Sequence, residues 1–207
     1  MAKKESTLKN MLIALMVITI VSGGVLGLIY GLTYEKIEKN KQEKNAQAIA
    51  LVLKTDNGKE IANIKTMTID DMDFNLAYDA DSAFIGAAIK TSTLKGFGGK
   101  IELMVGILAN DSINKVSVLS QAETPGLGAN MSKDGNKLMN SINQKGINDI
   151  SDTLNNTYSV KVKKDNGKID ALSAATISSR AVCEAIEKAV NGYMNNKDKF
   201  VKGGNNE

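Results

Sequence analysis

The chain has 207 residues, and its 26 lysine and arginine residues nearly balance its 23 aspartate and glutamate residues. It contains no histidine, which excludes His-ligated zinc or haem, a Ser-His-Asp triad and an imidazole proton shuttle. One cysteine excludes an internal disulfide and a cysteine-ligated iron–sulfur cluster, and we expect no metal site. The net charge of +3 does not favour nucleic-acid binding. Any redox or group-transfer chemistry must therefore come from a cofactor.

The first predicted element is a transmembrane helix over residues 11–32, preceded by a short basic N-terminus, residues 1–10. The span contains no charged side chain. A helix of this length covers about 33 Å, slightly more than the roughly 30 Å hydrocarbon core of a bilayer. A cleaved signal peptide is the main alternative, but its apolar region is shorter, and no small-x-small cleavage site precedes the charged residues that follow. We therefore expect a permanent anchor.

Two further properties of the span concern its packing and its orientation. Gly23, Gly27 and Gly31 lie at four-residue spacing, a G-x-x-x-G pattern typical of packed membrane helices, although glycine is also common in spans without such a role. Basic residues occur on both sides of the span, so their count does not decide its orientation. A single anchor behind a short basic N-terminus most often leaves the large domain outside the cytoplasm, and we expect that arrangement.

An α+β domain is predicted over residues 56–195, after a juxtamembrane helix over residues 33–55 that Asn57-Gly58 stops. Apolar and β-branched residues predict the strands of this domain, and a polar stretch predicts one short helix. The predicted strands are 82–91, 100–108, 113–119 and 158–162, and the predicted short helix is 133–144. Gly96-Phe97-Gly98-Gly99 joins the first two strands as a loop. The domain is long enough to have its own core.

The last predicted element is an amphipathic helix over residues 177–194. Apolar residues recur on one face at helical spacing, whereas Glu184, Glu187 and Lys188 lie largely on the other. Cys183 lies beside the apolar face, and we expect it to be packed there. The polar residues 196–207 are predicted to form a frayed tail.

The segment leading into this helix is the first candidate site. It reads Asp170-Ala171-Leu172-Ser173-Ala174-Ala175-Thr176. Small residues let a ligand approach the backbone, and the N–H groups and dipole of a first helical turn favour a phosphate. The Thr176 hydroxyl is suitably placed there for esterification to a phosphate. Ordinary N-capping also explains a serine or threonine here. Arg180, one turn further on, either contacts such a phosphate or is a solvated helix residue.

The second candidate site is Glu123-Thr124-Pro125-Gly126-Leu127-Gly128, which follows the predicted strand over residues 113–119. It contains the only proline of the chain. Pro125 stiffens the segment, while its glycines permit conformations that lay the backbone against a planar ligand. Taken alone, such a segment can equally be an ordinary turn.

Together these motifs resemble those of the FMN-carrying G subunit of the Rnf electron-transport complex, and more distantly those of the C subunit of the sodium-pumping NADH:quinone reductase. The resemblance covers nearly the whole chain, from the basic start and the span to the last helix. The flavinylation pattern of these proteins is Asp-x-x-Ser/Thr-Gly-Ala-Thr. The chain keeps Asp170, Ser173, Ala175 and Thr176, and it departs from the pattern at Ala174, where glycine is usual.

The resemblance implies a specific cofactor and specific roles. FMN would be joined to Thr176 through a phosphodiester, installed from FAD by a separate magnesium-dependent flavin transferase. Asp170 would serve the recognition or catalysis of that enzyme. The residues that would hold the phosphate and the ribityl chain are Ser173, Ala174 and Ala175. The residues that would border the isoalloxazine ring are Glu123, Thr124, Gly126 and Leu127.

The function implied is that of a membrane-anchored flavoprotein subunit in an Rnf-type ferredoxin:NAD oxidoreductase that drives Na⁺ or H⁺ export. The protein would have no substrate turnover of its own. Its partners would be the other subunits of the complex, and its domain would lie on the periplasmic or extracellular side of the bacterial inner membrane. The length of the chain favours Rnf over the quinone-reducing pump, whose subunit usually carries longer insertions. The alternative from a different class is a non-redox, membrane-anchored binding or assembly module, in which Ser173–Thr176 merely caps a helix.

Overall fold

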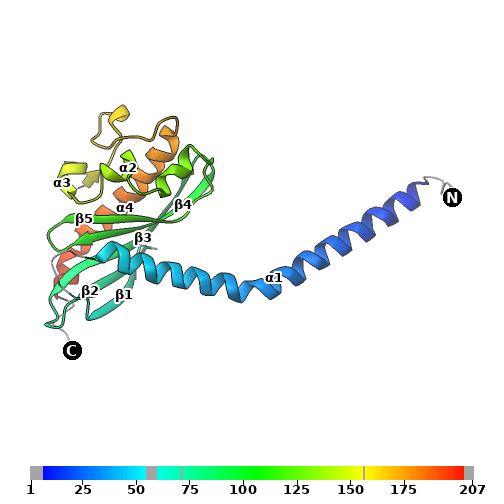
Figure 1. Ribbon diagram of the computed structural model, residues 1–207, viewed down its shortest axis with the longest axis horizontal. Coiled ribbons are helices and arrows are strands. Elements are labelled where there is room, and N and C mark those ends of the chain that lie inside the picture. The colour runs from blue at the N-terminus through cyan, green and yellow to red at the C-terminus, as the bar shows by residue number, and fades with distance from the viewer. Residues whose placement is uncertain (1–6, 55–59, 71, 156, 203–207) are drawn as a thin grey trace. The chain divides into compact units, whose positions relative to one another are not determined.

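The computed structural model describes residues 7–54, 60–70, 72–155 and 157–202 (Figure 1). The predicted helix stop at Asn57-Gly58 lies outside these described residues. The chain divides into two compact units, with the boundary between Lys44 and Asn45. The first unit is helical, and the second contains the β-sheet.

Helix α1 (Leu8–Leu53) runs without a break through the predicted span and the predicted juxtamembrane helix. In the first unit its apolar side chains are exposed, and Leu12, Leu26 and Ile29 each expose more than half of their surface. Within the described part of the chain, α1 is the helix that is long and apolar enough to cross a membrane. So large an apolar surface is unfavourable in water and favourable in hydrocarbon, which fits the expected membrane anchor.

The second unit is built on a six-stranded antiparallel sheet whose strands follow one another in chain order. The strands are β1 (Asn63–Ile69), β2 (Met72–Tyr78), β3 (Phe84–Gly96), β4 (Gly99–Leu108), β5 (Ser112–Ser120) and β6 (Lys145–Gly146). β7 (Asp152–Leu154) and β8 (Thr157–Ser159) form a separate hairpin. Strands β1 and β2 were not among the predicted strands. β1 is an edge strand with almost entirely exposed side chains, so its sequence lacks the alternation that marks a half-buried strand.

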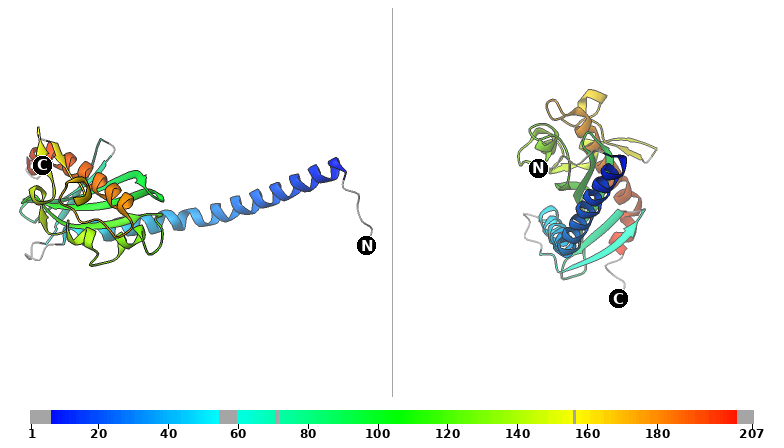
Figure 2. Two further views of the ribbon diagram at one scale, coloured as in Figure 1. Left: turned by 90° about the horizontal axis from the view of Figure 1, so that it is seen from above. Right: turned by 90° about the vertical axis from the view of Figure 1, so that its right-hand side faces the viewer.

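Both faces of the sheet are covered. Helix α4 (Thr176–Lys202) crosses one face (Figure 2), where Phe74 and Leu76 belong to its core. The last turns of α1 cover the other face, where they pack with Ala77 and Ala88. Neighbouring residues of one strand point to opposite faces, so each central strand serves both cores. The predicted α+β fold is confirmed.

In the described residues between β5 and α4, the helices and strands are all short. These are η1 (Gly128–Ser132), α2 (Lys137–Asn140), α3 (Ile147–Ile150) and η2 (Lys163–Asp165), together with β6, β7 and β8. The helix predicted over residues 133–144 is therefore the single turn α2, and the strand predicted over residues 158–162 overlaps β8. This connection carries both candidate motifs close to the start of α4.

The end of α4 differs from the predicted tail. The helix continues to Lys202, because its last turns still pack on the sheet. Phe200 is fully buried, with its ring centroid 5.4 Å from that of Phe74. The Tyr78 hydroxyl donates a hydrogen bond to the Phe200 carbonyl over 2.9 Å. One aromatic residue in a polar segment is too weak a signal to predict this packing from sequence.

Candidate functional site

Residues 170–176, called here the threonine loop, end at Thr176, the first residue of α4. Two backbone hydrogen bonds close the loop, from Ala175 N–H to the Leu172 carbonyl over 3.2 Å and from Ser179 N–H to the Ala175 carbonyl over 3.0 Å. The buried Ser179 hydroxyl accepts from Leu172 N–H and donates to the Ala175 carbonyl. Thr176 is half-buried, and its hydroxyl accepts a hydrogen bond from Lys164 Nζ over 3.0 Å. The loop therefore presents this hydroxyl at the helix N-terminus.

Ala174 explains why glycine is usual in the flavinylation pattern. Its φ angle is +56°, in the left-handed region that favours glycine. Alanine at this position therefore adopts a conformation that is strained for it and that glycine adopts readily. Ala174 and Ser173 are exposed, so the added methyl group meets no packed core.

Residues 123–128, called here the proline loop, form a compact turn that leads into η1. Gly126 has a φ angle of +81°, which also lies in the left-handed region that favours glycine. The Leu127 N–H donates to the Thr124 carbonyl over 3.1 Å, and the Asn130 side-chain amide donates to the Gly126 carbonyl over 2.6 Å. This geometry leaves the Leu127 side chain about two-fifths exposed, at 41%.

Glu123 connects the proline loop to two distant segments. Its carboxylate is buried, and Oε1 accepts from the backbone N–H of Gly98 over 3.0 Å. Oε2 accepts from the hydroxyl of Ser178, in the first turn of α4, over 2.6 Å. Gly128 lies so close that a Cβ there would stand 2.5 Å from Oε2 and 2.6 Å from the Ser178 hydroxyl. The carboxylate thus joins the β3–β4 turn, the proline loop and α4.

These segments enclose a pocket of about 320 Å³. Six of the predicted site residues line it: Glu123, Thr124, Leu127, Ala174, Ala175 and Thr176. It is also lined by Gly128, which belongs to the second candidate motif, and by three residues outside both motifs: Phe97, Ile177 and Ser178. Large apolar side chains are exposed around the pocket, at 69% for Phe97 and 50% for Ile177. A hydroxyl at a helix N-terminus beside apolar walls is a suitable arrangement for a ligand with a phosphate and a flat ring system.

The structure does not bring every predicted residue to this pocket. Ser173, Gly126 and Asp170 are not among its lining residues. Asp170 instead pairs with Lys163, whose Nζ lies 2.8 Å from Oδ1 and 2.9 Å from Oδ2. Of the residues that were missed, Ser178 had no local signal, because its contact with Glu123 joins positions far apart in the chain.

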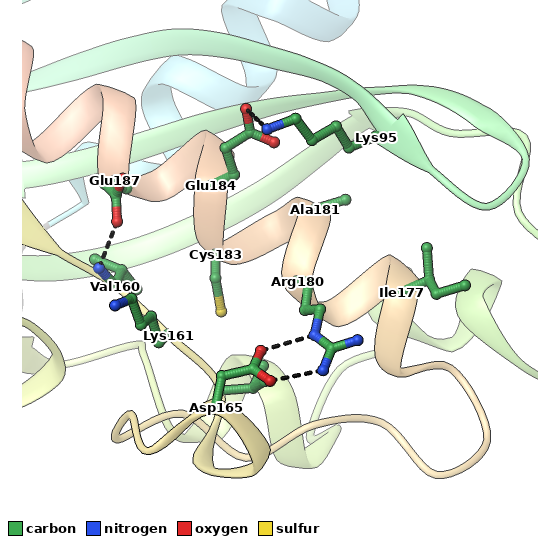
Figure 3. A pocket seen from close by; sticks show the side chains of 11 residues that line it. Lys95, Val160, Lys161, Asp165, Ile177, Arg180, Ala181, Cys183, Glu184 and Glu187 are labelled. Atoms are coloured by element: carbon green, nitrogen blue, oxygen red, sulfur yellow. Dashed lines mark hydrogen bonds and ion pairs between the residues drawn. The ribbon is translucent and has the colours of Figure 1, made fainter.

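A second hollow, of about 540 Å³, lies between α4 and residues 160–165 (Figure 3). Arg180 forms a bidentate ion pair with Asp165 there, over 2.7 Å and 2.6 Å, a partner that neither predicted alternative for Arg180 included. These hydrogen bonds hold the pKa of Asp165 below its ordinary value. Burial, with a smaller effect from the Glu187 charge, raises the pKa of Cys183 to about 12. Cys183 is therefore a packed thiol, as expected, and is not a nucleophile near neutral pH.

The sequence profile of the FMN-binding domain family matches residues 96–191, which include the proline loop, the threonine loop and most of α4. An FMN-binding domain that follows one apolar helix defines a membrane-anchored flavoprotein.

Relatives of known name are similar over almost the whole chain. A protein of Vibrio cholerae serotype O1 is 36% identical over 195 residues, which cover 90% of each chain. A protein of Pseudoalteromonas atlantica is 28% identical over 210 residues, covering 98% of this chain and 95% of its own. One of Pseudomonas aeruginosa is 26% identical over 208 residues, covering 97% and 94%. Each is named as the G subunit of an ion-translocating oxidoreductase complex, and the chain belongs to this family.

Proposed function

We propose that the protein carries FMN covalently on Thr176 and transfers electrons within an Rnf-type ion-translocating oxidoreductase complex. The observation that carries this proposal is the pocket in which the two motifs meet. The proline loop and the threonine loop lie far apart in the chain, and neither alone distinguishes a binding site from a turn. A shared pocket beside an available hydroxyl is what a tethered planar cofactor requires.

The residues of the pocket suit distinct parts of FMN. The flavin supplies reversible one- and two-electron transfer when it is bound. Thr176 provides the ester oxygen, and the backbone of Ser173, Ala174 and Ala175 lies beside it for the phosphate and the ribityl chain. Exposed apolar side chains, at Leu127 and Phe97, offer surfaces for the isoalloxazine ring. Thr124 and Gly126 belong to the same loop.

Glu123 acts on the pocket in a different way from a direct ligand. Both of its carboxylate oxygens already accept hydrogen bonds from the protein. We infer that Glu123 shapes the side of the pocket that borders the ring, chiefly because it holds the proline loop against α4. The Glu123 carboxylate can then keep the same hydrogen bonds in the oxidised and reduced states of the flavin, so the shape of the pocket stays the same.

Attachment requires a second enzyme. In the proposed reaction, the Thr176 oxygen attacks the phosphorus on the FMN side of FAD. The bond from that phosphorus to the bridging oxygen breaks, AMP leaves with this oxygen, and a base of the flavin transferase takes the hydroxyl proton. Asp170 is partly exposed and lies outside the pocket, which suits a role in recognition by the transferase.

The name of the relatives supports the wider role. We propose that electrons pass through this subunit between other subunits of a ferredoxin:NAD oxidoreductase that drives Na⁺ or H⁺ export. Helix α1 would hold the domain at the membrane beside those subunits. The domain would lie on the periplasmic or extracellular side, where a covalent bond prevents the loss of FMN.

The test is to produce the full chain together with a flavin transferase and to separate it under denaturing conditions. The wild-type protein should give a fluorescent band, and the peptide containing Thr176 should gain the mass of FMN less one water. Thr176→Ala should lose both signals. Thr153→Ala is the matched control, because it removes an exposed threonine hydroxyl outside the pocket, and it should retain them. A wild-type protein without covalent flavin would overturn the proposal and favour the non-redox binding or assembly module.

A further inference from the structure

The three residues of η2, called here the lysine turn, each bind a different residue of the threonine loop or of the start of α4. Lys163 pairs with Asp170, at the beginning of the threonine loop. Lys164 donates a hydrogen bond to Thr176, at its end. The third residue of the turn forms the bidentate ion pair described above with Arg180, one helical turn further on. One short element thus holds both ends of the flavinylation motif.

The backbone around the lysine turn is well fixed. Val162 and Ile169 form a β-bridge and are fully buried. The Lys163 N–H donates to the Ile169 carbonyl over 2.8 Å, and the Asp165 N–H donates to the Val162 carbonyl over 2.8 Å. Asn166 completes the turn with a φ angle of +58°, a conformation that asparagine tolerates better than most residues. The side chain of Lys164 therefore starts from a defined position beside α4.

The partners within the turn distinguish Lys164 from its neighbours. The carboxylates of Asp170 and Asp165 are engaged by Lys163 and Arg180. Lys164 instead directs its ammonium group to a neutral hydroxyl oxygen. A hydrogen bond between a cation and a neutral hydroxyl contributes little at an exposed site, whereas a cation beside a phosphate oxygen forms a strong, charge-assisted hydrogen bond. The hydrogen bond from Lys164 therefore becomes strong only when the Thr176 oxygen is esterified to a phosphate.

We propose that Lys164 is the side chain that binds the phosphate esterified to Thr176. This inference rests on the proposed covalent attachment. The phosphodiester carries one negative charge, and Lys164 supplies the matching positive charge together with the N–H groups of the first turn of α4. Lys163 serves a different purpose, because its charge is directed to Asp170.

The experiment compares four full-length proteins in a phosphorus-free detergent: wild type, Lys164→Ala, Lys164→Arg and Lys163→Ala. The last is the matched control, since it removes an equally exposed lysine one position away. Each is incubated with FAD and flavin transferase, and attachment is followed by in-gel fluorescence. The phosphorus-31 NMR shift of the loaded phosphodiester is then measured. This shift responds to the charge and hydrogen bonding beside the phosphate, and the Lys163→Ala control separates that response from a general change in the lysine turn.

We expect attachment to Lys164→Ala to be about 10-fold slower, as for the loss of one hydrogen bond to a charged group. Its phosphorus resonance should move, Lys164→Arg should restore both properties, and Lys163→Ala should keep the wild-type resonance. If the variants load with a wild-type rate and resonance, or if both alanine variants move the resonance equally, the role of Lys164 is refuted while Thr176 attachment stands. If the wild-type protein carries no flavin on Thr176, the proposed function fails and this inference fails with it.

Discussion

The two loops that meet at the pocket are held in different ways. The proline loop is fixed from inside the protein, by a buried carboxylate that joins Gly98 and Ser178. The threonine loop is closed by the buried Ser179 hydroxyl and is also bound at both ends by exposed side chains of the lysine turn, and its backbone includes the strained Ala174. The wall that would face the ring is therefore rigid. The wall that carries the hydroxyl stays at the surface, where a modifying enzyme can reach it.

The largest effect on the free energy of unfolding is expected at Glu123, the buried residue that fixes the proline loop. Glu123→Ala leaves the Gly98 N–H and the Ser178 hydroxyl without their acceptor, and we expect a loss of about 3 kcal/mol in the free energy of unfolding. Urea denaturation of the full chain, followed by circular dichroism, measures this quantity. Glu123→Gln is the control that keeps the size and one acceptor oxygen, and it should lose less. An alanine variant as stable as the wild type would show that the proline loop is held by other contacts.

A smaller loss is expected at Gly128, where the difficulty is space. A methyl group there would lie 2.5 Å from Glu123 Oε2 and 2.9 Å from Glu123 Cβ. The carboxylate would have to move away from Ser178, so Gly128→Ala should cost about 2 kcal/mol, as overpacking in a core does. Gly126 offers the matched comparison, since nothing lies within 4 Å of its missing Cβ. Gly126→Ala should suffer only from its positive φ angle, and equal losses in the two variants would argue against crowding at Gly128.

The same contrast explains how much the sequence could predict. The threonine loop is contiguous, so its pattern and its place before a helix could be identified from local residues. The proline loop could be proposed as a binding segment, but its fixation by Glu123 could not. The partners of that carboxylate come from the β3–β4 turn and from α4, and only the packing of α4 on the folded sheet brings them together. The lysine turn was missed for a similar reason, because a run of lysine, aspartate, asparagine and glycine predicts only a solvated turn.

In the threonine loop, by contrast, one substitution is expected to raise the free energy of unfolding. Ala174→Gly removes the strain of a left-handed alanine, which is worth roughly 1–2 kcal/mol, but adds backbone entropy to the unfolded chain. We expect a net gain of about 1 kcal/mol in the free energy of unfolding, measured by urea denaturation before flavin attachment. The attachment reaction itself should proceed at a similar rate, because alanine already adopts the required conformation. A destabilised glycine variant would contradict the assigned backbone geometry.

The smallest effect is expected at the ion pair between Asp165 and Arg180, which is exposed and therefore screened by salt. Hydrogen bonds from Arg180 lower the pKa of Asp165 below its ordinary value of 3.8. The pair consequently stabilises the folded protein fully above the pKa of the unfolded chain, and this contribution is lost as the pH falls through the lower folded pKa.

Carboxyl NMR titration of the wild type should detect the lowered pKa of Asp165. Arg180→Lys should return that pKa toward its ordinary value, because lysine keeps the charge but loses the bidentate geometry. Asp165→Asn should remove this part of the acid dependence of unfolding, measured in urea between about pH 7 and pH 2. If Arg180→Lys leaves the pKa of Asp165 unchanged, the lowered pKa comes from the positive charges around Asp165 and not from the bidentate hydrogen bonds of Arg180.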